Sequence, residues 1–271
     1  MTSIAEVPSP DTTMKSSILS ASLLVPSCCS VAAFGPSRAS RLVRHSVVRH
    51  AYVDTSEHAQ RDTNALLSWC DSYGVQRSGA IDYCPTASFK YNHDATDLTC
   101  YALEDLPAGT SVLNVPASLV LHSYNIQHGE TGTLVQAEEF LTKLREPLAP
   151  FYLFVKLLYE YSAGDASPYY DWLNALPRTC DAGASMTPVC YECLPPLAGT
   201  YAKMERVRYI NYRSAAKTIE WLPEWIIEDL DVCKWAFNAV STRSWGLGDG
   251  TDERVMVPLG DMVRERIVHL S

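Results

Sequence analysis

The sequence lacks the features that mark several common functional classes. It has 22 Lys and Arg residues against 31 Asp and Glu, so it lacks the clustered positive charge that phosphate backbones require. No apolar run approaches the roughly 18 residues that a membrane-spanning helix needs. The seven histidines are scattered and have no paired ligand spacing. We therefore expect no nucleic-acid partner, no membrane insertion and no metal site. A hydrophobic fraction of 47% instead indicates a soluble chain with a core to bury.

Cysteine is present nine times, but the residues are spread along the chain and do not suggest a disulfide framework. Cys180, Cys190 and Cys193 could belong to a zinc knuckle, although no fourth ligand follows at a suitable spacing. Cys190 and Cys193 also have the spacing of a redox pair, without the βαβ pattern that would support one. The pattern favours free, mostly buried thiols in a reducing compartment.

Acidic residues are missing from the chain between Lys15 and Val53. Residues 1–53 carry a net charge of +3, so the remainder carries −12. A small and apolar stretch at residues 18–33 is followed by Phe34 and then by an Arg- and Ser-rich stretch. Such an asymmetry is typical of a removable targeting segment.

The order of these features resembles the bipartite presequence of complex algal plastids, in which an aromatic residue starts the transit peptide after signal cleavage. We expect cleavage between Ala33 and Phe34, disorder over residues 1–53, and a plastid location. An ordinary secretory signal or a disordered tail is the alternative. A mitochondrial presequence comes third, because the apolar stretch precedes the Arg-rich one.

The body of the chain begins with a helix and a short β pattern. Apolar residues such as Leu66 and Trp69 recur at helical spacing, which predicts a helix over residues 54–73. Residues 78–91 show no regular pattern. Residues 98–102 and 111–115 are rich in β-formers and are predicted to pair as antiparallel strands.

A long helical pattern follows, and a β pattern then returns. Helices are predicted over residues 138–144, 151–161, 169–176, 197–219 and 226–241, and a last strand over residues 255–257. Helices inserted between separated strands favour an α+β fold over a parallel βαβ sheet.

Three groups of motifs occur in one order along residues 60–262. They are LEDLPAG at 103–109 with LNVP at 113–116; PYYDWL at 168–173 with LP at 176–177 and LAGT at 197–200; and WAFNAVSTRS at 235–244 with VPLGDM at 257–262. Their combination resembles the SET-domain protein-lysine methyltransferases of the Rubisco large-subunit methyltransferase type. The resemblance implies a split SET β-domain interrupted by a large helical insert.

The resemblance also implies an activity. Members of that family transfer a methyl group from S-adenosylmethionine to a lysine side chain of a protein, and rarely to a histidine. The amine must be neutral, so it is desolvated in a narrow channel. Backbone carbonyls and a tyrosine hydroxyl align its lone pair with the methyl group, and this positioning supplies most of the rate. We expect a monomer with a protein substrate.

The resemblance assigns site residues one by one. Arg243 corresponds to an arginine at the cofactor pocket, where a guanidinium can fork onto the cofactor carboxylate; otherwise it is a surface arginine after a helix. Thr242 and Asp261 correspond to residues whose backbone carbonyls line the lysine channel; Asp261 could equally be a turn or cap residue.

Two departures from the family pattern accompany this match. Asp97, Leu98 and Thr99 occupy the cofactor-binding loop, and Asp97 and Thr99 replace the two glycines that let the backbone approach the cofactor. After Met262 the family's Asn-His pair is replaced by VRE at residues 263–265. No counterpart of the catalytic tyrosine strand or of the C-terminal helical substrate-binding domain follows.

These departures lead to a C-terminally truncated enzyme as the main hypothesis, with residues 263–271 a translated intron or the result of a real early stop. We divide the chain into a presequence (1–53), a first SET segment with its leading helix (54–122), a helical insert (123–240) and the start of a second SET segment (241–271). Such a chain should be inactive alone. A catalytically degenerate SET-like protein-binding module is the alternative, and an unrelated helical plastid protein is the third.

Overall fold

The computed structural model of the protein describes residues 51–57, 59–85, 98–126, 133–247 and 252–262. The chain divides between Val47 and Val48, and all the described residues belong to the second part, Val48–Ser271. The predicted signal and transit segments, Asp97 and the divergent residues 263–271 lie outside the described residues.

Folded structure starts slightly earlier than the predicted boundary at residue 54. Val53 is buried in the core, and the ring of Tyr52 packs on those of Tyr161 and Trp225, with centroids 5.9 and 5.2 Å away. The last two residues of the predicted presequence are therefore part of the packed body.

The first helix is shorter than predicted. Helix α1 spans Thr63–Ser72. The side chain of Asp62 caps its N-terminus by accepting a hydrogen bond from the amide of Ala65 at 2.8 Å. The predicted start at residue 54 was wrong, because this aspartate fixes the helix end. Just before the cap, Arg61 is bound to the carbonyl of Ala175 at 2.8 Å. Gly74 follows with a φ of +80°, as expected after a helix.

The predicted pairing of residues 98–102 with 111–115 was also wrong. Strand β3 (Leu98–Ala102) pairs antiparallel with β2 (Ile81–Pro85), and β4 (Leu113–Asn114) pairs antiparallel with β1 (Gln76–Arg77). Both partners come from residues 76–85, most of which showed no regular pattern in the sequence. Asp82 and Pro85 lower the strand propensity of residues 81–85, so the sequence pattern did not predict this strand. Asp82 instead serves the sheet by accepting a cross-strand hydrogen bond from the Tyr101 hydroxyl at 3.2 Å.

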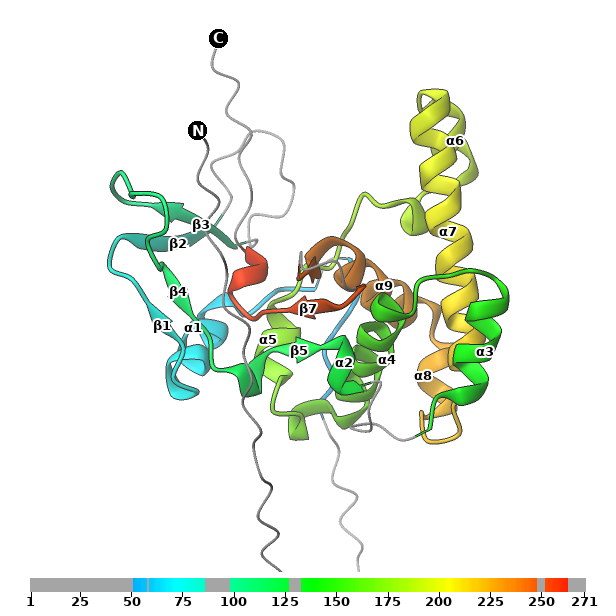
Figure 1. The fold of residues 1–271 in the computed structure, drawn as a ribbon, viewed down its shortest axis with the longest axis horizontal. Coiled ribbons are helices and arrows are strands. Elements are labelled where there is room, and N and C mark those ends of the chain that lie inside the picture. Colours follow the sequence, from blue (N-terminus) through cyan, green and yellow to red (C-terminus); the bar gives the residue numbers. More distant parts are fainter. Residues whose placement is uncertain (1–50, 58, 86–97, 127–132, 248–251, 263–271) are drawn as a thin grey trace, which may run out of the picture. The chain divides into compact units, whose positions relative to one another are not determined.

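A third sheet joins segments from either side of the helical region. Its strand order is β5 (Leu121–His122), β7 (Arg254–Met256) and β6 (Trp245–Gly246), all antiparallel, with Leu121 opposite Met256. The helices therefore lie in sequence between strands of one sheet (Figure 1). This arrangement confirms the predicted mixed α+β fold.

The helical region follows the predicted pattern, except that the short helices Ser123–Asn125 and Pro188–Cys193 were not predicted and one predicted helix is split. Its helices are α2 (Ser123–Asn125), α3 (Val135–Lys143), α4 (Leu148–Ala163), α5 (Tyr170–Ala175), α6 (Pro188–Cys193), α7 (Pro196–Ala216), α8 (Glu224–Glu228) and α9 (Leu230–Arg243). The single helix predicted over residues 226–241 is divided at Asp229. That residue is extended, and its carboxylate accepts from the amides of Asp231 and Val232, so it caps α9 and ends α8.

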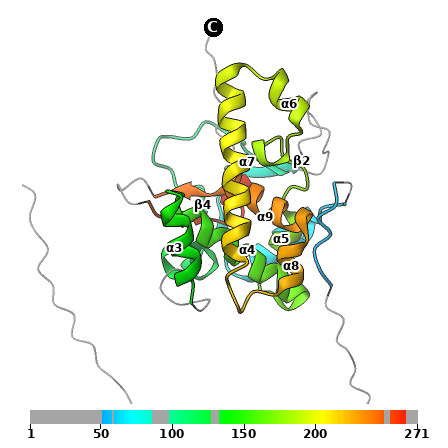
Figure 2. The same ribbon diagram turned by 90° about the vertical axis from the view of Figure 1, so that its right-hand side faces the viewer.

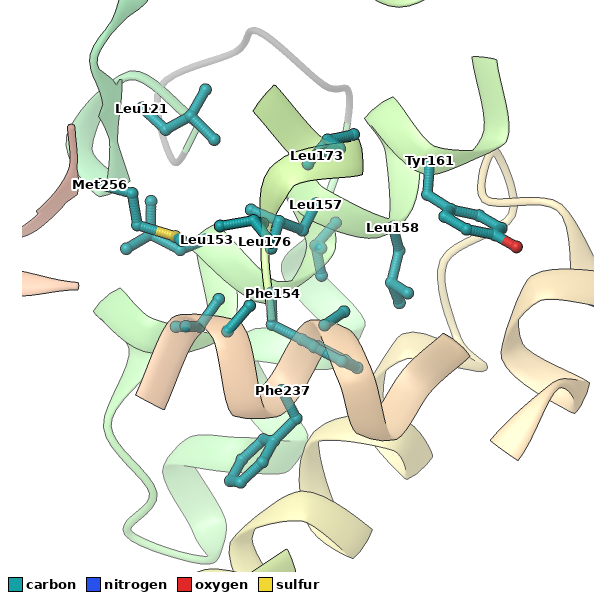
Figure 3. Close-up of a cluster of buried hydrophobic side chains, with 14 of the residues drawn as sticks. Leu121, Leu153, Phe154, Leu157, Leu158, Tyr161, Leu173, Leu176, Phe237 and Met256 are labelled. Carbon is teal, nitrogen blue, oxygen red and sulfur yellow. The ribbon is translucent and has the colours of Figure 1, made fainter. Parts of the chain in front are cut away.

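Helix α4 is the centre of the core. Figure 3 shows Leu153, Phe154, Leu157 and Leu158 of this helix among side chains from α9, α5, β5 and β7. The other labelled members of the cluster are Leu121, Tyr161, Leu173, Leu176, Phe237 and Met256, and all of them are buried. The third sheet is thus fixed to the helical region by shared apolar contacts. Among the described residues, no helix combines the length and apolarity that crossing a membrane requires.

Candidate functional site

The C-terminal end of α9 is tied to a later turn of the chain by Arg243. Its Nη1 donates to the main-chain oxygen of Asp261 at 3.0 Å and to its carboxylate Oδ2 at 3.2 Å, and lies 3.1 Å from the sulfur of Met262. Asp261 and Met262, which accept these hydrogen bonds, both belong to η6, a 3-10 turn that spans Gly260–Met262. The Arg243 and Asp261 side chains are 8% and 0% exposed, so this is a buried ion pair.

The solvent-exposed surface of Asp261 belongs to its main chain. The residue as a whole is 7% exposed while its side chain is fully buried. The tight reversal before it explains this orientation: Leu259 has a φ of +64°, and the amide of Asp261 donates to Val257 at 2.9 Å. A carbonyl oxygen has two acceptor lone pairs. Among the described residues, Arg243 is the single donor to this carbonyl, which leaves one position for another donor.

Opposing effects act on the carboxyl group of Asp261. Burial raises its pKa above the ordinary value, because a charged carboxylate loses its hydration. The charge and hydrogen bond of Arg243 act in the opposite direction, followed by the Trp172 indole and the charge of Arg61. Two guanidinium groups, those of Arg243 and Arg61, therefore act on this one carboxylate.

Trp172 and Arg61 were not identified from the sequence as members of this site. The indole Nε1 of Trp172 and the Oδ1 of Asp261 lie close enough to influence each other, yet neither meets hydrogen-bond geometry with any described residue. Trp172 lies within the PYYDWL motif, which was the available signal. Arg61 sits in a stretch without any motif, so its long-range bond to Ala175 could not be predicted.

The other predicted site residues are placed as follows. Thr242 precedes Arg243 in α9, and its hydroxyl donates back to the carbonyl of Asn238 at 2.8 Å, so the side chain is held on its own helix. Leu98 and Thr99 begin β3, opposite Pro85 and Cys84, and β3 contacts η6. Figure 1 shows this turn, in red, beside the β2–β3 pair.

The turn η6 thus contacts both the end of α9, through Arg243, and strand β3. These three elements are far apart in the sequence. That Arg243 and the loop at Asp97, Leu98 and Thr99 bind a cofactor, and that the carbonyls of Thr242 and Asp261 line a channel, stay predictions. The described residues hold no group of three His, Cys, Asp or Glu side chains placed to bind a metal ion.

The chain matches no protein-family model and no curated protein sequence. Its fold is similar to that of solved structures of Rubisco LSMT. A structure of Rubisco LSMT bound to sinefungin and monomethyllysine superposes with a TM-score of 0.55 at 18% identity, and one bound to AdoMet with a TM-score of 0.54 at 17% identity. The SET domain of LSMT bound to MeLysine and AdoHcy gives a TM-score of 0.57 at 18% identity.

Each of these matches covers 75% of this chain and 44% of the LSMT chain. The chain therefore has the fold of the Rubisco LSMT SET domain over three-quarters of its length, which confirms the resemblance seen in the three motif groups. It spans less than half the length of the structures that it matches.

Proposed function

We propose that the chain is the cofactor- and lysine-binding part of an S-adenosylmethionine-dependent protein-lysine N-methyltransferase of the SET type, acting as a monomer. The observation that carries this proposal is the main-chain carbonyl of Asp261. It accepts a hydrogen bond from a buried guanidinium, within a fold that matches the LSMT SET domain. The solved relatives are bound to AdoMet or AdoHcy and to methylated lysine, which supports the same ligand classes here.

The side chains present include groups that suit an anionic ligand. Arg243 and Arg61 both act electrostatically on the carboxyl group of Asp261, and the buried N–H of Trp172 has no acceptor among the described residues. Arg243 and the start of β3, with Leu98 and Thr99, would hold the cofactor. When bound, the cofactor supplies a methyl group on a sulfonium.

The backbone of η6 would position the substrate lysine. A neutral lysine amine has two N–H donors. A carbonyl oxygen accepts two hydrogen bonds, and Arg243 makes one of them to Asp261 among the described residues. Because Arg243 binds the same oxygen, it fixes the direction in which that acceptor points. The carbonyl of Thr242, one residue away along α9, is the second proposed acceptor. Acceptors held in this way orient the amine lone pair without any charged group that would protonate it.

One feature favours a second function on the same fold. Asp97 and Thr99 replace small glycines in the predicted cofactor loop, and Arg243 already has a carboxylate partner in Asp261. A catalytically degenerate SET-like module that binds proteins without cofactor would show both features.

Titration of S-adenosylhomocysteine into the purified chain distinguishes the two functions. We expect saturable binding to the parent chain by calorimetry. In Arg243→Lys the affinity should fall about tenfold, a change of about 1.4 kcal/mol in binding free energy. The reason is that lysine keeps the positive charge but lacks the two-pronged donor geometry of a guanidinium. Arg206→Lys, on the exposed side of α7, is the matched control and should bind normally. Absence of binding in a folded sample would favour the protein-binding module.

We also propose that residues 1–53 direct the protein to a plastid. The acid-free composition and the order of apolar stretch, Phe34 and Arg-rich stretch support this address. A fluorescent protein fused behind residues 1–53 should accumulate in the plastid of an alga with complex plastids. Replacing Phe34 with Ala should divert it, because the aromatic residue is the feature that separates this segment from a secretory signal. Secretion or a cytosolic signal from the unchanged segment would contradict the assignment.

A further inference from the structure

Helix α6 presents two exposed cysteines one turn apart. Cys190 and Cys193 are both exposed, whereas Cys70 and Cys233 are buried. Helix α6 lies against the first half of α7 (Figures 1 and 2), and Tyr191 faces inward with its hydroxyl donating to the carbonyl of Gly183 at 2.5 Å. This anchor leaves both thiols on the accessible side of a fixed helix. The expectation of mostly buried thiols does not hold for this pair.

The hydroxyl of Thr187 is placed to activate one of them. Its oxygen accepts from the amide of Cys190 at 3.4 Å and lies 3.1 Å from the sulfur of the same residue. Because the oxygen accepts from the amide, its own proton can be donated to the sulfur. A donor stabilises the thiolate over the thiol, and the pKa of Cys190 is lowered, chiefly by this side chain. Burial raises the pKa of Cys70 to about 12 and that of Cys233 to about 11, so those thiols stay protonated.

We propose that Cys190 and Cys193 form a reversible thiol–disulfide exchange site, oxidised by the disulfide of a small thiol or of a dithiol protein. Residues three apart on a helix have Cβ atoms about 5–6 Å apart, and a disulfide needs about 3.5–4.5 Å. The turn must therefore tighten slightly on closure. A disulfide formed under such strain is readily reduced, which makes it suited to cycling and not to permanent structure. This site is independent of the proposed methyl transfer.

The reaction balances as two successive exchanges. The Cys190 thiolate attacks one sulfur of the external disulfide, a mixed disulfide forms, and the other external sulfur leaves as a thiolate that takes up a proton. The Cys193 thiol then loses its proton and attacks the Cys190 sulfur, and the second external thiolate leaves and is protonated. Two protein thiols become one disulfide, and the external disulfide becomes two thiols.

The test uses the reduced full chain and glutathione disulfide as the probe. Intact mass and mapping of the peptide that spans Cys180 to Cys193 should show an internal Cys190–Cys193 disulfide without retained glutathione. Cys193→Ser should stop at a glutathione adduct on Cys190, and Cys190→Ser should react about tenfold more slowly, because the activated thiol is gone. Cys180→Ser is the matched control, since burial raises the pKa of the Cys180 thiol, and it should behave as the parent.

A second variant separates activation from simple exposure. Thr187→Val removes the hydroxyl at nearly constant volume and should slow the reaction of Cys190 about tenfold, while Thr187→Ser should restore it. The proposal is overturned if the parent chain accumulates separate glutathione adducts on the two cysteines, or if Cys190→Ser and the parent react at equal rates. Reduction of the disulfide by excess glutathione should return the starting mass, and resistance to it would overturn reversibility.

Discussion

Replacing Arg243 by methionine should lower the free energy of unfolding by about 3–5 kcal/mol, because it leaves the fully buried carboxylate of Asp261 without its closest cation. The same change releases η6 from α9. The measurement is a denaturant titration of the parent chain and the variant. The double variant Arg243→Met with Asp261→Asn should recover most of the loss, because it removes both charges together. A single variant as stable as the parent would show that the pair contributes nothing to the fold.

The pH dependence of this variant gives a second readout. Burial raises the pKa of the Asp261 carboxyl above 3.8, so the folded state holds its proton to higher pH than the unfolded state does. The stability that this carboxyl contributes is complete below the unfolded pKa and is lost as pH rises through the folded pKa. Without Arg243 the folded pKa rises further, so the variant should lose more stability than the parent as the pH rises above the ordinary range of a carboxyl group. The Asp261→Asn background should abolish the difference.

Replacing Gly183 by alanine should cost about 3 kcal/mol, the upper end for an overpacked site. A Cβ atom there would lie 2.7 Å from the Cα and 2.8 Å from the carbonyl carbon of Ala202, and closer still to its carbonyl oxygen. All three are backbone atoms of α7, so no side-chain rotation can relieve the clash. The amide of Gly183 also donates to Glu205 at 2.6 Å, and its carbonyl accepts from Tyr191, so the loop cannot move away without losing both bonds.

Gly79→Ala is the matched control, because nothing lies within 4 Å of a Cβ atom at that position. Denaturant midpoints should separate the two variants. Hydrogen exchange over residues 188–205 should show whether Gly183→Ala loosens α6 and the first half of α7 before the core unfolds. Equal stability and equal exchange in the two variants would contradict the close packing of this loop on α7.

The helices were predictable because their signal is long. Helix α4 has ten buried residues in sixteen, and its apolar spacing is clear in the sequence. Strands β1 and β4 have two residues each and carry no period to detect. The pairing of β2 with β3 depends on a partner that contains Asp82 and Pro85, two residues that argue against a strand when read locally.

Site residues were predictable to the extent that motifs contain them. Arg243 and Asp261 came from the third motif group, and the structure places them in contact. The contact itself was not predictable, because an intervening loop and strand determine how the chain returns to the end of α9. The same limit applies to Trp172, whose place beside Asp261 depends on how α5 packs against the rest of the core.

The third sheet has a consequence for how the chain acquires its structure. Leu121 of β5 pairs with Met256 of β7, and the whole helical region is synthesised between them. During translation β5 therefore emerges long before its hydrogen-bonding partner exists. The local helices can form early, but the loop that joins the two strands is long and its closure is entropically costly. Sheet closure should be a late event that follows packing of α4 and α9, and until then the apolar face of α4 that contacts β7 is open to chaperones.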